Sequence, residues 1–288
     1  MSARVLEGKV FAAQIKESVK AEVACLRDRH GITPGLVVII VGENPASKVY
    51  VANKHKGCNE VGIYSEVVQM SAATTKEQLL AKIIELNGNS AIHGILLQLP
   101  LPDHLKQDEA EFLNAIHPEK DVDGFHPVNV GNLSIGQEHL VPCTPYGCIK
   151  MLELANIDIA GKHAVIIGRS NIVGKPMANL LLARNATVTI CHSRTTDLPT
   201  HTRQADILVV AIGKTHFVTK EMVRPGAVVI DVGINRTAEG KLVGDVDFEQ
   251  VKEVASAITP VPGGVGLLTI AMLLSNTVKA VKLKHNIK

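Results

Sequence analysis

Tryptophan is absent from this chain of 288 residues, and aromatic residues make up only 3% of it. A core must therefore be built from Val, Ile, Leu and Ala, and the hydrophobic fraction of 46% is large enough to supply one. The formal net charge is only +2, and no long run carries a single sign. We therefore expect neither nucleic acid nor a membrane surface as the main partner.

Long apolar runs and a cysteine framework are missing as well. No apolar stretch reaches the ~18–20 residues that a membrane span needs, and residues 1–8 lack the layout of a signal peptide. The five cysteines are scattered, and only Cys143 and Cys148 are close in sequence, with no second pair nearby to complete a metal site. We therefore expect reduced, non-catalytic thiols in a cytoplasmic protein, and no metal.

Short apolar, β-rich runs alternate with helical patterns along the chain. Strands are expected at 36–41, 65–70, 94–99, 163–167, 187–191, 207–212, 228–232 and 257–260. Helices are expected at 47–61, 76–86, 107–115, 174–184 and 268–282. This alternation predicts an α/β fold with parallel sheets covered on both faces.

The length fits two domains of ordinary size. The boundary is expected between Gly131 and Gly161, where helical or loop segments link the two series of strands. Two α/β lobes on a short connection normally leave a cleft, and ligands bind in such clefts beyond the carboxyl ends of the strands. We therefore expect two lobes around a ligand-binding cleft.

A candidate dinucleotide site follows the strand at 163–167. Gly168 permits a tight turn, and backbone amides at the start of the next helix can face a pyrophosphate. The match to G-x-G-x-x-G is imperfect, because Ser170 and Val173 replace the second and third glycines. An ordinary strand-to-helix turn is therefore the alternative interpretation of this segment.

The end of the following strand bears on the choice of cofactor. A site for NAD usually has Asp or Glu there, bonded to the ribose hydroxyls. This chain has Ser193 and Arg194 instead, and Arg169 lies in the preceding turn. Hydroxyl and guanidinium groups suit a 2′-phosphate, so NADP is preferred over NAD. The alternative is that Arg194 merely solvates a loop.

Several polar residues of the first half are candidates for substrate binding or catalysis. Tyr50 and Lys54 share a helix face, although a lysine on a helix is usually a solvated surface residue. Gln98 lies in an otherwise apolar run, so its amide needs partners, either within the fold or in a site. Asp121 and Asp123 lack the further ligands of a calcium loop, which favours substrate binding or turn formation.

A Gly-rich turn at 260–266 precedes the last expected helix. It either lets backbone approach a ligand closely or simply connects two elements.

In this order, the motifs closely resemble the methylenetetrahydrofolate dehydrogenase/cyclohydrolase family across nearly the whole chain. The matching runs are 41–47 with Tyr50 and Lys54, 94–102, 118–124, 142–145, 168–170, 173–177, 231–235 and 260–266. The resemblance implies a bifunctional, cytoplasmic enzyme of one-carbon metabolism, assembled as a homodimer. It would oxidise 5,10-methylenetetrahydrofolate with NADP and hydrolyse the methenyl product to 10-formyltetrahydrofolate.

The resemblance also implies residue roles and domain limits. Residues 1–140, completed by helix 268–288, would form the folate-binding catalytic domain, and 141–267 a Rossmann-type NADP-binding domain. Lys54, Gln98 and Asp123 would be catalytic, with Tyr50 as a wall for folate and Asp123 as an anchor for its pterin. Folate contacts would include Leu97, Leu99, Pro262, Gly263, Gly264, Val265 and Gly266. Cofactor contacts would be Gly168, Arg169, Ser170, Ser193 and Ile234.

One departure from the family pattern is Leu267-Leu268, where the family usually has Pro-Met. Loss of the proline is expected to loosen the 262–266 loop and to alter the folate pocket. Two rival functions are considered: a monofunctional NAD(P)-dependent dehydrogenase of the same fold, and a non-catalytic dinucleotide-binding regulator. The first would lack methenyl-folate hydrolysis, and the second would bind NADP without any folate-dependent reduction.

Overall fold

The computed structural model describes residues 2–287, and the chain divides into two compact units. Unit 1 comprises Met1–Ala13 and Thr144–Thr269, and unit 2 comprises Gln14–Cys143 and Ile270–Lys288. The second domain was expected at 141–267, and the long segment of unit 1 is Thr144–Thr269. The two sets of limits differ by at most three residues. Residues 1–13, in contrast, group with unit 1 rather than with the first lobe, because a short N-terminal strand joins the sheet of unit 1.

Unit 1 is built on a six-stranded, wholly parallel sheet in the order β1-β11-β8-β7-β5-β6. The strands are β1 (Arg4–Val5), β5 (His163–Ile167), β6 (Thr187–Cys191), β7 (Ile207–Val210), β8 (Val228–Asp231) and β11 (Ala257–Ile258). The chain runs from β5 outward to β6 on one side and to β7 on the other. The carboxyl ends of β5 and β7 therefore form the switch point at which such sheets bind ligands.

The remaining elements of unit 1 are shorter. The helices are α6 (Cys143–Leu154), α7 (Gly174–Leu182), α8 (Leu198–Thr202) and α9 (Phe248–Val251), with a 3-10 turn at Lys220–Met222. A small antiparallel hairpin pairs β9 (Asn235–Arg236) with β10 (Leu242–Val243). The core of this unit is aliphatic, as the composition predicts, with Val165, Leu208 and Val229 wholly buried in it.

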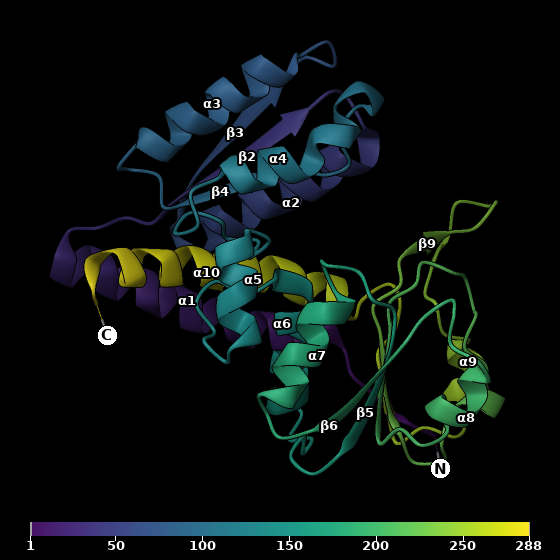
Figure 1. The fold of residues 1–288 in the computed structure, drawn as a ribbon. Helices are drawn as coiled ribbons and strands as arrows, with labels where there is room; N and C mark the ends of the chain where they lie inside the picture. Colours follow the sequence, from purple (N-terminus) through teal and green to yellow (C-terminus); the bar gives the residue numbers. More distant parts are fainter. Residues whose placement is uncertain (1, 288) are drawn as a thin grey trace. The chain divides into compact units, whose positions relative to one another are not determined.

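Unit 2 contains a three-stranded parallel sheet in the order β3-β2-β4. Its strands are β2 (Gly35–Val41), β3 (Tyr64–Met70) and β4 (Gly94–Leu97), and its helices and 3-10 turn are α1 (Gly8–His30), α2 (Pro45–Val61), α3 (Lys76–Gly88), η1 (Asp103–Asp108), α4 (Glu109–Ala115), α5 (Pro127–Ser134) and α10 (Val265–His285). Helices α3 and α4 cover one face of the sheet and α2 lies on the other (Figure 1). The first residues of α1 and of α10 belong to unit 1.

Helix α10 is long and apolar enough to cross a membrane by length and composition. Within the fold, 61% of its most apolar window is buried, and Ala271 and Leu274 are completely inaccessible. A Cβ on Gly57 of α2 would lie 3.3 Å from Ile270, so the glycine lets α2 and α10 approach closely. Helix α10 is thus packed as a core helix of unit 2.

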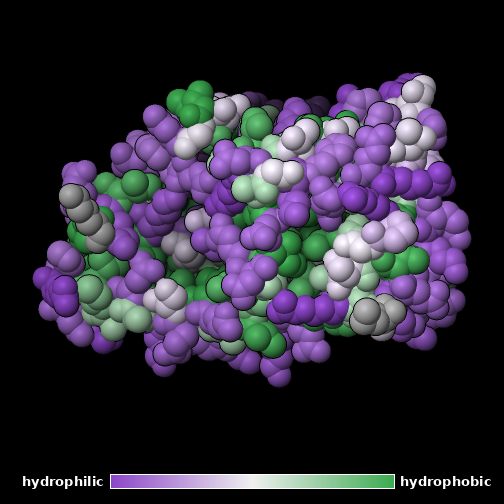
Figure 2. Space-filling view, turned by 90° about the horizontal axis from the view of Figure 1, so that it is seen from below, coloured by the Kyte–Doolittle hydropathy of each residue, from purple (hydrophilic) through white to green (hydrophobic). Residues whose placement is uncertain are grey.

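The molecular face drawn in Figure 2 is mostly hydrophilic, with hydrophobic residues in small groups.

Candidate active site

Lys54 is placed by helix α2, whose start is well defined. The side chain of Asn44 accepts a hydrogen bond from the Ser47 amide at 3.1 Å, and Pro45 occupies the first turn. Both features are typical of a helix start, and they place it at Pro45, two residues before the expected start at 47. Lys54 lies one turn after Tyr50 and is half-buried, so it is not the solvated surface lysine that a helical position alone would predict.

The side chain of Gln98 contacts Lys54 within unit 2. Gln98 directly follows β4, and its backbone N–H donates to the Ile39 carbonyl at 2.8 Å. Lys54 Nζ donates to Gln98 Oε1 at 2.9 Å, while Gln98 Nε2 donates to the Leu99 carbonyl at 2.6 Å. The second bond fixes the orientation of the amide, so its oxygen faces the lysine. Gln98 therefore satisfies its own polar atoms and holds Lys54, combining the two roles that the sequence left open.

Asp123 completes the charged group. Burial lowers the pKa of Lys54 below its usual value, and the negative charge of Asp123 opposes that shift. Burial likewise raises the pKa of Asp123, opposed by the charge of Lys54. Both shifts favour the neutral forms, so the environment weakens the hold of Lys54 on its proton. An amine whose pKa is lowered in this way gives up its proton more readily, which suits the role of a general base.

Cys143, which the sequence predicts to be a reduced, non-catalytic thiol, also lies next to these residues. It is 3% exposed, and its thiol donates to the Val122 carbonyl at 3.4 Å. Burial, followed by the charge of Asp123, raises the pKa of Cys143 well above its usual value. The thiol is therefore protonated and unreactive, and it contributes packing beside Asp123 rather than nucleophilic chemistry.

The apolar residues expected around the substrate are placed differently from one another. Tyr50 is 39% exposed, so its ring is accessible to a ligand. Leu99 is half-buried beside Gln98. Leu97 is only 3% exposed and packs in the core with residues of α3 and α4, so its side chain is enclosed by the core.

In unit 1, Gly168 ends strand β5 at the switch point of the sheet. Its φ is +128°, and a Cβ there would lie 2.3 Å from the Ala211 carbonyl oxygen, just beyond β7. A Cβ on Gly174, the first residue of α7, would lie 2.2 Å from the Gly168 carbonyl oxygen. Both positions thus exclude any side chain, and they give the tight strand-to-helix turn expected of a dinucleotide site.

Ser170 changes how this turn can bind an anion. Its Oγ accepts hydrogen bonds from the amides of Val173 at 3.2 Å and Gly174 at 3.4 Å. These two amides, which were expected to face a pyrophosphate, therefore already have a partner at the start of α7.

The end of β6 matches the requirements of a 2′-phosphate. Ser193 and Arg194 follow Cys191 and are exposed, as is Arg169 in the turn after β5. Within residues 2–287, neither guanidinium forms an ion pair with an acidic side chain. Two available guanidinium groups and a hydroxyl are a donor set suited to a phosphate.

The remaining expected contacts also lie in unit 1. Ile234, just after β8, is 48% exposed, and a Cβ on Gly266 would lie 3.6 Å from its Cδ1. Pro262 and Gly263 are exposed, whereas Gly264 and Val265 are buried. Leu267 falls in the first turn of α10 and its amide bonds to the Gly264 carbonyl at 3.3 Å. The helix start is thus formed without the proline, and the expected loosening of the loop stays a prediction.

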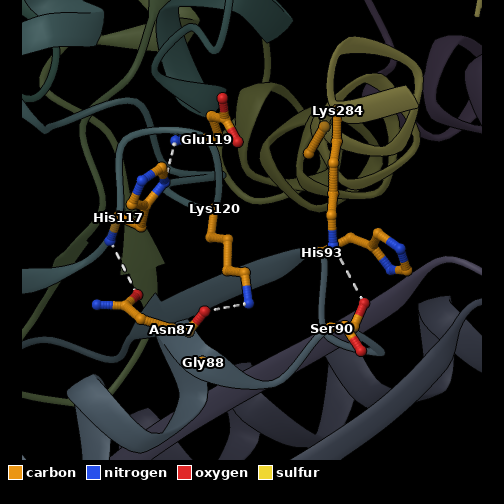
Figure 3. Close-up of a pocket in the computed structure, with 9 residues that line it drawn as sticks. Asn87, Gly88, Ser90, His93, His117, Glu119, Lys120 and Lys284 are labelled. Carbon is orange, nitrogen blue, oxygen red and sulfur yellow. Dashed lines mark hydrogen bonds between the residues drawn. The ribbon is translucent and has the colours of Figure 1, made fainter. Parts of the chain in front are cut away.

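A surface pocket of about 270 Å³ in unit 2 lies elsewhere (Figure 3). It is lined by His93, Lys120 and Lys284 among others, near the amino ends of β2 and β4. His93 Nδ1 accepts from the Gly35 amide at 3.1 Å, and burial together with nearby cations lowers the pKa of His93 to about 4. Lys54 and Gln98, by contrast, lie toward the carboxyl ends of β2 and β4.

Two family models match the chain in succession. The tetrahydrofolate dehydrogenase/cyclohydrolase catalytic domain matches residues 6–123, and the NAD(P)-binding domain of the same family matches residues 142–285. The chain belongs to this tetrahydrofolate dehydrogenase/cyclohydrolase family. The family expected from the sequence is therefore confirmed, and the α/β fold with two domains is confirmed with it.

Relatives within the family are similar over their whole length. The bifunctional protein FolD of Moorella thermoacetica is 60% identical over 282 residues, which cover 98% of this chain and 100% of the relative. The bifunctional methylenetetrahydrofolate dehydrogenase/cyclohydrolase of Campylobacter jejuni superposes with a TM-score of 0.94 at 52% identity, covering 98% and 100% of the two chains. The Trypanosoma brucei enzyme, solved with NADP and an inhibitor, superposes at 0.93 with 40% identity and 99% coverage of both.

Proposed function

We propose that the chain is a bifunctional enzyme acting on folates with NADP. It oxidises 5,10-methylenetetrahydrofolate to 5,10-methenyltetrahydrofolate and hydrolyses that product to 10-formyltetrahydrofolate. These reactions would belong to the one-carbon metabolism that serves purine, histidine and methionine biosynthesis. The observation that carries this proposal is the bond from Lys54 Nζ to Gln98 Oε1 at 2.9 Å, beside the carboxyl group of Asp123. Family members at 60% and 52% identity that are named as bifunctional support it.

Unit 1 would hold the cofactor. NADP⁺, when bound, accepts a hydride from the methylene carbon of the folate. Gly168 provides the close backbone approach at the switch point, and Ser170 lies in the turn that would receive the pyrophosphate. Arg169, Ser193 and Arg194 would bind the 2′-phosphate. Ile234 offers an exposed apolar side chain for the nicotinamide end.

Unit 2 would hold the folate. The Tyr50 ring forms an apolar wall for the substrate, and Asp123 accepts hydrogen bonds from the pterin. In unit 1, the loop at Pro262–Gly266 has Pro262 and Gly263 exposed, whereas Gly264 and Val265 are buried. These roles, like the assignment of folate to unit 2 and NADP to unit 1, are carried over from matching motif positions.

In the hydrolytic step, Lys54 acts as general base. As the water oxygen bonds to the methenyl carbon, one water proton passes to Lys54 Nζ. The remaining hydroxyl proton replaces the carbon on N5 as the C–N5 bond breaks, which leaves the formyl group on N10. The proton on Lys54 then leaves to solvent. Gln98 keeps the amine in position throughout, and burial lowers its pKa, which favours the neutral form that can accept a proton.

The test is a spectrophotometric assay in two parts. Methylenetetrahydrofolate is offered with NADP and then with NAD, and methenyltetrahydrofolate is offered alone. We expect reduction of NADP at a higher kcat/KM than of NAD, and hydrolysis well above the solvent rate. Dehydrogenase activity without hydrolysis would support the monofunctional alternative. NADP binding without either reaction would support a regulator and refute the proposal.

We further propose a homodimer that forms through strand β3. This strand of seven residues lies at the edge of the sheet in unit 2 and pairs only with β2 among the described residues. Its residues Tyr64 and Val67 are 53% and 38% exposed. An open edge strand with apolar side chains is a template for pairing with a second chain.

Light scattering should give about twice the chain mass of 30.8 kDa. Val67→Lys on β3 should favour the monomer, whereas Ile84→Lys, at a position 64% exposed on α3, should not. A parent protein that is monomeric at micromolar concentration would refute this assembly.

The five cysteines, none of which is in a disulfide, support a cytoplasmic location.

A further inference from the structure

Asn276 of α10 makes contacts far along the chain from its own position. Its side chain is completely inaccessible to solvent. Its Nδ2 group donates to the Val122 carbonyl at 2.8 Å and to the Val141 carbonyl at 2.7 Å, and it lies 3.6 Å from Cys143 Sγ. Val122 immediately precedes Asp123. One buried amide thus joins the two segments that carry Asp123 and Cys143.

The orientation of this amide is determined by its partners. Rotating it by 180° would place the oxygen against two carbonyl oxygens, so only Nδ2 can face them. This orientation leaves the oxygen of the amide without a partner. Within residues 2–287, Asn276 Oδ1 is the one fully buried side-chain nitrogen or oxygen that has no hydrogen-bond partner. An unpaired buried acceptor is unfavourable. Leucine has a similar branched shape and would avoid this cost, so the donor side of the amide is what distinguishes asparagine here.

The segments that Asn276 joins pack directly on each other. Gly124, with φ of +70°, leaves no room for a side chain, since a Cβ there would lie 2.7 Å from Pro142 N and from Val141 C. Lys120 fixes the start of the same segment, donating to the carbonyls of Leu86, Asn87 and Asn89 at 2.7–3.0 Å. Figure 3 draws the bond to Asn87. Lys120 therefore holds the segment where it enters, and Asn276 holds it next to Asp123.

We propose that Asn276 is the positioning residue for the Asp123 carboxyl group, holding the segments 122–124 and 141–143 in the one arrangement that keeps Asp123 beside Lys54. The inference rests on the proposed function, because it assigns Asp123 a part in folate binding and in controlling Lys54. Asn276 itself would touch neither substrate nor cofactor. Its loss would free the Asp123 segment while the Lys54–Gln98 bond stays in place.

The experiment compares three variants of the full chain. Asn276→Leu removes both donated hydrogen bonds and keeps the branched shape of the side chain, and Asn276→Ser retains one short donor. Thr277→Val is the matched control, because Thr277 is equally buried on the same helix but donates only to Leu273 of that helix, at 2.9 Å. For each, KM and kcat for methenyl-folate hydrolysis are measured across pH, with KM for NADP and the thermal midpoint.

For Asn276→Leu we expect KM for folate to rise about tenfold, as for the loss of a buried hydrogen-bonded contact. The acid limb of the kcat profile should move to lower pH. The titratable groups next to Lys54 are Asp123 and Cys143. Cys143 stays protonated, so Asp123 supplies the charge, and a displaced Asp123 no longer raises the pKa of Lys54. Asn276→Ser should shift both values in the same direction by less. Thr277→Val should leave both at parental values, and KM for NADP should not change in any variant.

Parental KM and acid limb in both Asn276 variants would overturn the inference. A lowered thermal midpoint with no change in those two readouts would also overturn it, since the role would then be structural only. If Asn276→Leu fails to fold, the soluble Asn276→Ser variant decides on the same readouts. A parent enzyme that neither reduces NADP with methylene-folate nor hydrolyses methenyl-folate would instead refute the proposed function, and this inference with it.

Discussion

Replacing Lys54 with methionine should separate the two proposed reactions. The methionine keeps most of the side-chain length but has no group that can accept a proton. Hydrolysis of methenyl-folate should therefore collapse, because attack by water on the methenyl carbon releases a proton that needs a base. Hydride transfer to NADP releases no proton from the folate, so the dehydrogenase reaction should be affected much less.

The size of the effect follows from what Lys54 contributes. Loss of a general base costs typically 10²–10⁴-fold in rate, or about 3–5 kcal/mol of transition-state free energy. The folded state should suffer less. Gln98 Oε1 loses the bond from Lys54 at 2.9 Å, which costs about 1–3 kcal/mol if the oxygen stays buried. Removal of a half-buried amine that is partly desolvated offsets some of that loss.

The assay measures methenyl-folate hydrolysis and folate-dependent NADP reduction separately, with folate affinity determined by titration. Lys56→Met, at an exposed position on the same helix, is the matched control and should retain both activities. Lys54→Arg keeps the positive charge near Asp123, but a guanidinium does not lose its proton in proteins. It should therefore lose hydrolysis as well. Parental hydrolysis in either Lys54 variant would remove the amine from the role of base.

Three further changes test other parts of the structure. Asp123→Asn should weaken folate binding and move the acid limb of hydrolysis to lower pH, since the charge of Asp123 raises the pKa of Lys54; unchanged KM and kcat would exclude Asp123 from the site. Gly168→Ala places a Cβ 2.3 Å from the Ala211 oxygen at a φ of +128°, so it should cost about 1–3 kcal/mol and raise KM for NADP; parental values of both would contradict the close packing of this turn. Burial raises the pKa of Asp231 from 3.8 to about 6. The folded state then binds the proton more tightly, and up to about 3 kcal/mol of stability present below pH 4 is lost as pH rises through 6. The thermal midpoint of the parent should accordingly fall relative to that of Asp231→Asn between pH 4 and pH 7. A difference between the two midpoints that does not change with pH would refute the raised pKa of Asp231.

The parallel sheets and most of their strands could be predicted from the sequence, because buried strands form short apolar runs that local pattern reveals. The N-terminal elements could not. Strand β1 has two residues and exists only through its pairing with β11, about 250 positions later. Helix α1 begins at Gly8, after Glu7, and so lacks the Ser, Thr, Asp or Asn that marks a helix start in a sequence. Tertiary pairing therefore assigns residues 1–13 to unit 1, against the expected domain limits.

In the candidate site, too, the sequence reveals which residues take part but not which residues contact each other. Lys54, Gln98 and Asp123 were identifiable from motifs, and the spacing of Tyr50 and Lys54 gave their common helix face. The bond between Lys54 and Gln98 joins positions 44 residues apart, and no local rule predicts it. Cys143 could be predicted only to be a reduced, non-catalytic thiol, because the sequence does not show that it is buried next to a carboxyl group.

Long-range contacts also explain why a lysine can serve as a base in this fold. An exposed helix lysine would remain charged at neutral pH and would repel a cationic methenyl group. Burial lowers the pKa of Lys54 but does not by itself fix the position of the amine. Gln98, held by the Leu99 carbonyl, supplies the position, and Asp123 supplies a charge that limits the fall in the pKa. The reactivity of Lys54 therefore depends on where the chain segments after β4 and around Val122 are held, which is why a residue of α10 such as Asn276 can influence a reaction that it does not touch.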